Sequence, residues 1–237
     1  MRRAGASIGR QAALLGALLA GCAPAPGPEG PPPGLRFLSP EEIAAARAER
    51  NEWFKTSPES PLPEEVKRRF QGLDYYPFNP SLRFFAHLER YDDPKPHPMT
   101  TTNGERRPAV AVGKLVWTQD GVRRELEVYQ LRDVGPREWG GLFLPFQDET
   151  SGVETYGAGR YIDLAGGIDD WYVLDFNLAY YPSCAYGKPG YQCPRTPPAN
   201  RLDFPVRAGE RGWVDAHGAG GPAASHGQAG RPTEVTK

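Results

Sequence analysis

The sequence predicts a mostly β fold, a sandwich or barrel of short antiparallel strands, preceded by one or two helices. Two apolar runs, Ala109–Thr118 and Val122–Leu131, flank Asp120-Gly121, a dipeptide that favours a two-residue hairpin turn. Further short apolar runs are separated by clusters of glycine, proline and aspartate. Many short strands with turns at this spacing are typical of a sandwich or a barrel rather than of an α/β sheet.

The N-terminal part of the domain carries helix signals, and the rest carries strand signals. Ser39 is a suitable N-cap, followed by Pro40 at the first helical position and Glu42 three residues after the cap, so a helix is expected over residues 40–55. A second, shorter helix is expected over 62–70, because Gly72 stops it. The expected strands are Leu82–Leu88, Ala109–Thr118, Val122–Leu131, Leu142–Phe146, Arg160–Leu164, Trp171–Asn177 and Leu202–Val206.

Residues 1–21 have the pattern of an export signal. A basic start and an apolar run are followed by small residues directly before Cys22, and the apolar run is too short for a transmembrane span. The junction resembles the lipobox of bacterial lipoproteins, with Cys22 as the acylated N-terminus. An ordinary cleaved signal that ends near Ala23 or Ala25 is the alternative. We therefore expect an exported, palmitate-bearing lipoprotein anchored through Cys22 to the cell membrane or outer membrane, facing the periplasm or cell exterior.

The remaining chain divides into a tether, one domain and a tail. Residues 22–38 are rich in proline and glycine and are expected to form an extended tether. Residues 39–214 are expected to form a single β-rich domain. Residues 215–237 lack apolar periodicity and are expected to be disordered.

Charge and cysteine content narrow the classes of partner. Removal of residues 1–21 takes away three of the 28 basic residues and none of the 29 acidic ones, which leaves 25 against 29. A mildly acidic chain is a poor partner for nucleic acid, which requires a basic surface. Cys184 and Cys193 remain after acylation of Cys22, and a disulfide between them is expected in an oxidising compartment. A metal site built on these two cysteines and a histidine is the less favoured alternative, so we expect no metal and no cofactor.

Polar residues gather between Leu142 and Arg201, and they are the candidate site. The mature sequence lacks the common enzyme motifs: Gly-x-Ser-x-Gly, His-Glu-x-x-His, a Cys-x-x-Cys pair and a phosphate-binding glycine loop. The sequence therefore leaves open whether the protein is an enzyme. A guanidinium with carboxylates, amides and phenols can bind a small molecule, a glycan or a peptide. The candidate residues are Asp148, Thr150, Thr155, Tyr156, Arg160, Asp175, Asn177, Tyr180, Tyr186, Asn200 and Arg201.

Two interpretations of this set remain open. Arg160 and Lys188 are the only basic residues between Leu142 and Tyr191, so Arg160 is expected to pair with Asp148 or Asp175. The pair then either lines a polar pocket or forms a buried network that stitches loops together. A hydrolase that uses Asp148 or Asp175 as acid or base is the enzymatic alternative.

The same segment carries an ordered series of motifs that resembles a known family. The series is Phe146–Gly152, Thr155–Tyr161, Asp175-Phe176-Asn177, Cys184-Ala185-Tyr186 and Cys193-Pro194. It resembles the bacterial family labelled domain of unknown function 1684 (DUF1684), over roughly Trp53 to Trp213. The resemblance implies no activity, because the family has none assigned.

Overall fold

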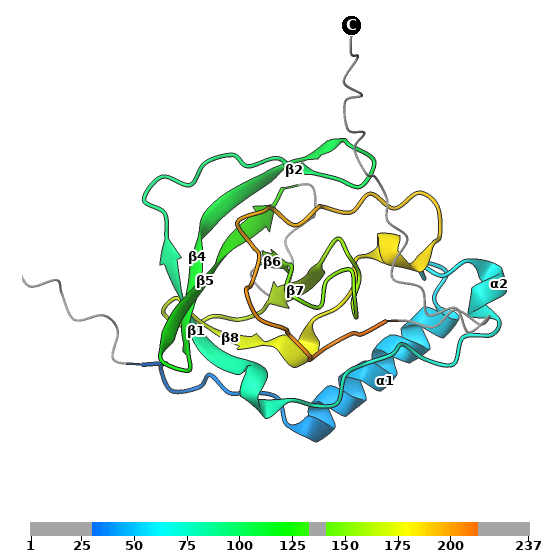
Figure 1. Ribbon diagram of the computed structural model, residues 1–237, viewed down its shortest axis with the longest axis horizontal. Helices are drawn as coiled ribbons and strands as arrows, with labels where there is room; N and C mark the ends of the chain where they lie inside the picture. The colour runs from blue at the N-terminus through cyan, green and yellow to red at the C-terminus, as the bar shows by residue number, and fades with distance from the viewer. Residues whose placement is uncertain (1–29, 133–140, 213–237) are drawn as a thin grey trace, which may run out of the picture. The chain divides into compact units, whose positions relative to one another are not determined.

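One antiparallel sheet of six strands, curled into a half-barrel, is the frame of the domain (Figure 1). The computed structural model describes residues 30–132 and 141–212, so the expected signal segment, Cys22 and the expected tail from residue 215 lie outside the described residues. The strand order is β7-β6-β5-β4-β1-β8. The strands are β1 (Arg83–Arg90), β4 (Ala109–Gln119), β5 (Val122–Leu131), β6 (Leu142–Phe146), β7 (Arg160–Leu164) and β8 (Trp171–Asp175), with the separate pair β2 (Met99–Thr100) and β3 (Arg106–Arg107).

The β4–β5 hairpin forms at the expected dipeptide. Gln119 pairs with Val122, and the two turn residues Asp120 and Gly121 have φ of 51° and 76°, the left-handed values that a tight two-residue turn requires. A bulge between Ala111 and Gly113 interrupts the register of β4. At Gly113 a Cβ atom would lie 2.4 Å from the Glu89 carbonyl oxygen, so the strands approach too closely there for any side chain.

Two apolar clusters cover the two faces of the sheet, and the segment after β8 closes its curl. Inward-facing residues such as Leu126, Leu144 and Leu174 form the main core. A second cluster, which includes Tyr129 and Tyr161, lies on the other face of the same strands. The curl is closed by two backbone hydrogen bonds of 2.9 and 3.0 Å between Tyr161 of β7 and Tyr180.

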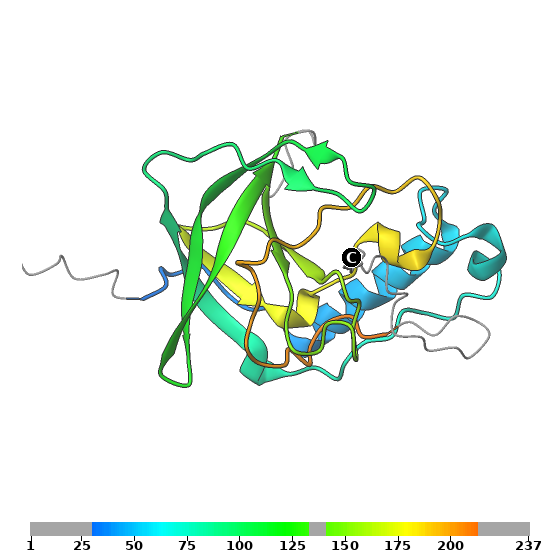
Figure 2. The ribbon, with the colours of Figure 1, turned by 45° about the horizontal axis from the view of Figure 1, so that its top comes forward.

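Helix α1 (Pro40–Thr56) begins as expected. The Ser39 side chain accepts from the Glu42 backbone, and Glu42 accepts from the Ser39 backbone N–H at 2.7 Å, which completes the expected capping box. Phe54 packs edge-on against Tyr186 with ring centroids 4.8 Å apart, so α1 lies beside the segment that carries the 3-10 turn Ser183–Tyr186 (Figure 2).

Several elements differ from those expected, most of them by only one or two residues. The second helix α2 is only Glu64–Lys67, and β8 ends at Asp175, where a 3-10 turn, Phe176–Leu178, begins. The segment 202–206 is not a strand. Its Leu202 N–H donates to the Gln147 carbonyl at 2.8 Å, but the Val206 N–H donates to the Asp148 carboxylate at 2.7 Å and Pro205 has no N–H to donate, so no ladder continues.

The end of the expected tether packs against the sheet. The rings of Phe37 and Phe85 lie 4.5 Å apart, and the Arg83 guanidinium lies 4.4 Å from the centre of the Phe37 ring.

Among the described residues, no helix combines the length and the apolar character that a membrane crossing needs.

Cys184 and Cys193 form the expected disulfide, with Cα atoms 6.1 Å apart. Its loop is held to the β2–β3 turn, because Thr102 donates its backbone N–H to the Cys193 carbonyl at 2.9 Å.

The double variant Cys184→Ser/Cys193→Ser is expected to lose roughly 2.5–3 kcal/mol of unfolding free energy, the chain-entropy value for so short a loop. Urea denaturation measures this loss, and an unchanged urea midpoint would contradict it.

Candidate functional site

Arg160, the first residue of β7, is the centre of the polar segment. It pairs with Phe146 across the sheet, and its side chain is 1% exposed. Gly159, directly before it, has φ of +99°, and a Cβ there would lie 2.5 Å from the Phe146 carbonyl oxygen. Only glycine fits this close turn, which directs the guanidinium inward.

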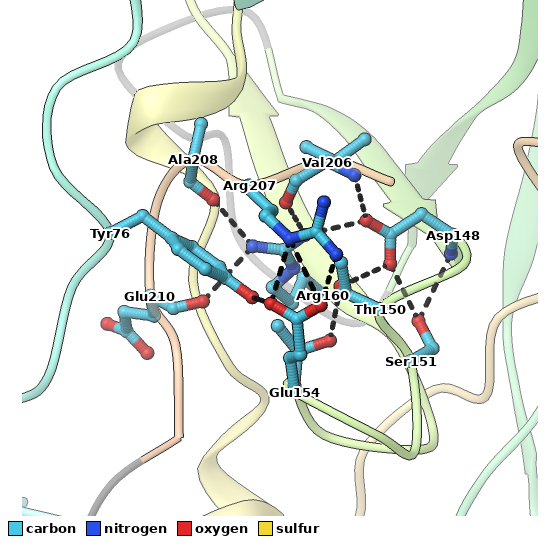
Figure 3. A network of polar contacts seen from close by, with 11 residues as sticks. Tyr76, Asp148, Thr150, Ser151, Glu154, Arg160, Val206, Arg207, Ala208 and Glu210 are labelled. Carbon is cyan, nitrogen blue, oxygen red and sulfur yellow. Dashed lines mark hydrogen bonds and ion pairs between the residues drawn. The ribbon is translucent and has the colours of Figure 1, made fainter. Parts of the chain in front are cut away.

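The guanidinium of Arg160 has a partner for each N–H of its two terminal nitrogens (Figure 3). One nitrogen donates to the carbonyl oxygens of Ala208 at 2.6 Å and Glu210 at 3.1 Å. The other donates to the Asp148 carboxylate at 3.0 Å and to the Val206 carbonyl at 2.6 Å. Arg160 therefore ties β7 to the last described segment of the chain.

Asp148 completes this network from the turn that follows β6. One of its oxygens accepts from Arg160 and from the Val206 backbone, and the other accepts from the hydroxyls of Thr150 at 2.8 Å and Ser151 at 3.0 Å. The Thr150 hydroxyl also lies 2.9 Å from that of Thr155. We call Asp148, Thr150, Ser151, Thr155 and Arg160 the Arg160 network. Asp148 and Arg160 are 0% and 1% exposed, so the ion pair of this network is closed to solvent, whereas Ser151 at its edge is partly buried.

A second chain of contacts lies beside the Arg160 network and is partly exposed. The Tyr76 hydroxyl donates to Glu154 at 3.0 Å, and Arg207 binds the same carboxylate with three contacts of 2.6 to 3.0 Å (Figure 3). Burial, and then the hydrogen bond to Glu154, raise the pKa of Tyr76 to about 12.

The raised pKa of Tyr76 predicts a loss of stability in alkali. The unfolded chain releases this proton near pH 10, its ordinary value, whereas the folded chain keeps it until about pH 12. The stabilisation is therefore complete below about pH 10 and is lost as pH rises through about 12. In Tyr76→Phe, the unfolding free energy measured in urea at pH 9.5 to 11.5 should fall less steeply with pH than in the wild type. Equal slopes would contradict the assignment.

Asp175 belongs to a different network. It accepts from the Arg83 side chain at 2.9 Å and from both the backbone and the side-chain amide of Asn177 at 2.9 Å. Asn177 also exchanges two 2.8 Å hydrogen bonds with the backbone of Asn79. Asp148 and Asp175 share no hydrogen-bond partner in the described structure. Arg160 therefore pairs with Asp148, one of its two expected partners, and not with Asp175.

Glu210 is the centre of a third buried network. This carboxylate is 1% exposed and accepts from Arg50 of α1 at 2.7 Å and from the Tyr181 backbone at 2.8 Å. It also accepts from the hydroxyl of Tyr186. Burial raises the pKa of this hydroxyl well above its ordinary value. The network joins α1, the disulfide region and the end of the described chain.

The remaining candidates lie apart from Arg160. Asn200, fully buried, accepts from the Glu127 backbone N–H at 2.9 Å and donates to the Glu127 and Pro145 carbonyls at 2.8 Å. Tyr180 donates to Asp163 at 2.8 Å, Tyr156 lies with its ring 6.0 Å from that of Tyr181, and Arg201 is exposed.

The structure thus brings together four of the eleven candidates, Asp148, Thr150, Thr155 and Arg160, and distributes the others over separate contacts. Sequence reasoning missed Glu210, Arg50 and Arg83, although Arg50 and Arg83 bind carboxylates that are each only 1% exposed. Arg50 and Glu210 are 160 residues apart, and no local pattern in the sequence signals such a pair. Within the described ranges, no three His, Cys, Asp or Glu side chains cluster closely enough to hold a metal ion.

Known proteins place the chain in a family but give it no activity. An uncharacterized protein of Haloarcula marismortui, solved by solution NMR, is 34% identical, with a TM-score of 0.54 over 72% of this chain and 92% of that one. No curated protein matches the chain. The model of the family described as protein of unknown function, DUF1684, matches residues 68–211, and the chain belongs to this family.

Proposed function

We propose that this chain is a membrane-tethered cell-envelope lipoprotein whose β domain has a structural or ligand-binding role, in which the Arg160 network holds the domain together. The observation that carries the proposal is the saturation of Arg160. Its two terminal nitrogens have four N–H bonds, and all four have acceptors inside the protein. A ligand would find no free donor on these nitrogens.

The geometry gives less support to a hydrolase that uses Asp148 or Asp175. A general acid or base must reach the proton that it transfers, directly or through one water. Asp148 is 0% exposed and Asp175 is 1% exposed, and each carboxylate accepts at least three hydrogen bonds from the protein. These contacts favour a structural role for both carboxylates.

The lipid anchor rests on Cys22 in the lipobox-like sequence. Cys22→Ser should abolish labelling by radioactive palmitate and move the protein from the membrane fraction to the soluble fraction, or block its processing. Without the thiol, no lipid can be attached through sulfur at this position.

The matched control for the anchor is Cys184→Ser/Cys193→Ser, which removes the other two cysteines and keeps Cys22. This control should still take up palmitate and sediment with membranes. Palmitate incorporation that persists in Cys22→Ser would refute the anchor. Because the label reports on lipid attachment and not on the fold, that outcome would leave the structural role of the Arg160 network untouched.

A further inference from the structure

The two halves of the Cys184–Cys193 disulfide differ in access. Cys193 is buried, with 7% of its surface exposed, whereas Cys184 is only partly buried. An attacking thiolate forms a bond to one sulfur of a disulfide and expels the other, so the outcome depends on which sulfur it reaches. Access favours attack on the Sγ atom of Cys184, with Cys193 as the leaving group.

The leaving sulfur has a hydrogen-bond donor in place. The backbone N–H of Cys184 donates to Sγ of Cys193 at 3.1 Å. A hydrogen bond to the charged form of a group favours that form, so this N–H stabilises a thiolate on Cys193. A stabilised thiolate is also the better leaving group. The hydrogen bond therefore favours the same direction of opening as the difference in access.

The attacked sulfur has an acceptor in place for the thiol that it becomes. Sγ of Cys184 lies 3.3 Å from the carbonyl oxygen of Tyr191. A disulfide sulfur carries no proton, so this contact becomes a hydrogen bond only when Cys184 is a thiol. The Thr102 hydroxyl lies 3.4 Å from the same sulfur and accepts from the Cys193 N–H at 3.3 Å. Both sulfurs of the reduced pair therefore have polar partners within reach of their present positions.

Contacts other than the S–S bond hold the disulfide loop in place. The Lys188 side chain donates to the Ser60 carbonyl at 2.9 Å, and the Tyr191 hydroxyl donates to the Glu59 carbonyl at 2.8 Å. A backbone hydrogen bond of 2.9 Å also holds the loop to the β2–β3 turn. Because none of these contacts runs through the S–S bond, the loop stays in place when that bond opens, and the sulfurs stay close enough to join again.

We propose that this disulfide is redox-active in the folded protein and that Cys184 is the site of attack by a dithiol reductant. The attacking thiolate bonds to Sγ of Cys184, the S–S bond breaks, and its electron pair stays on Cys193 as a thiolate. The second thiolate of the reductant then displaces Sγ of Cys184, which takes up a proton and donates to the Tyr191 carbonyl. The reductant leaves as a disulfide, and the electron pair that it loses reduces the cysteine pair. Of the protons that its thiols release, one goes to Cys184 and the other to solvent. Neither the lipid anchor nor the Arg160 network enters this chemistry.

Dithiothreitol is the probe for opening within the folded protein. The full-length protein is incubated with it without denaturant, samples are quenched with excess N-ethylmaleimide, and free thiols are counted by mass spectrometry. The rate of reduction should rise in proportion to the dithiothreitol concentration while the circular dichroism spectrum stays unchanged, and oxidised glutathione should restore the disulfide. A disulfide that opens only in urea, or whose opening abolishes the folded spectrum, would overturn the proposal.

A destabilised variant separates direct attack on the folded protein from attack on a small unfolded population. Arg160→Lys keeps every contact of the disulfide loop but lowers the stability of the whole domain, by an amount that urea denaturation measures. Direct attack on the folded protein leaves the rate of reduction unchanged in this variant. Reduction through the unfolded chain would instead accelerate with the unfolded population, by about 30-fold for a loss of about 2 kcal/mol, and that result would contradict the proposal.

Reduced glutathione is the probe for the site of attack, because a monothiol leaves a mixed disulfide on the sulfur that it attacks. After a brief reaction and an acid quench, peptide mapping should find about tenfold more glutathione on Cys184 than on Cys193. Tyr191→Phe is the matched control. It removes the hydroxyl bond to Glu59 but keeps the carbonyl beside Cys184, so this preference should persist. Equal labelling of the two cysteines, or a preference for Cys193, would refute the assignment of Cys184 as the attacked residue.

Discussion

Arg160→Met is expected to lower the free energy of unfolding by about 3–5 kcal/mol, the usual cost of removing one partner of a buried ion pair. The variant leaves the Asp148 carboxylate, which is 0% exposed, without its charged partner. It also leaves the carbonyls of Val206, Ala208 and Glu210 without a donor. Urea denaturation followed by circular dichroism measures the loss.

The conservative change Arg160→Lys separates a structural role from a recognition role. Lysine keeps the positive charge but cannot place four N–H bonds in the fork that these acceptors require, so a loss of about 2 kcal/mol is expected. Arg201→Lys is the matched control, because Arg201 is exposed, and it should change stability by less than about 0.5 kcal/mol. Wild-type stability of Arg160→Lys, together with loss of a ligand found in a thermal-shift screen, would instead assign Arg160 to recognition.

Local signals in the sequence predict the elements of this fold well. The Asp120-Gly121 turn and the Ser39 capping box depend on residues a few positions apart, and both form as expected. The Cys184–Cys193 disulfide also forms, because only nine positions separate the two residues. In each case, the interacting groups lie within one turn or one short loop, so the sequence contains all that determines the contact.

Contacts that depend on the closure of the sheet cannot be predicted from local signals in the sequence. Composition suggested that Arg160 pairs with Asp148 or Asp175, but only the folded arrangement places Asp148 beside it and gives Asp175 to Arg83. The segment 202–206 has the apolar pattern of a strand, yet its Val206 N–H donates to the Asp148 side chain and its Leu202 N–H to the Gln147 carbonyl, just beyond the end of β6. Tertiary partners that are distant in the sequence decide both outcomes.

Glu210→Gln is expected to lower the free energy of unfolding by about 3 kcal/mol. The change removes the negative charge that accepts hydrogen bonds from Arg50, the Tyr181 backbone and the Tyr186 hydroxyl. Glutamine keeps one acceptor oxygen but places an NH₂ group against donors, which leaves at least one of them unpaired beside a side chain that is 1% exposed. Glu149→Gln, at an exposed site, is the matched control and should change stability by less than about 0.5 kcal/mol.

A double-mutant cycle shows whether Glu210 stabilises the fold through its buried contacts or through general charge. Tyr186→Phe removes only the hydroxyl that donates to Glu210, and the two changes combined should cost about 0.5–3 kcal/mol less than their sum. Arg83→Met, which breaks the separate pair with Asp175, shares no partner with Glu210, and its cost should add to that of Glu210→Gln within about 0.5 kcal/mol. If Tyr186→Phe is additive as well, the Glu210 carboxylate does not stabilise the fold through this hydroxyl.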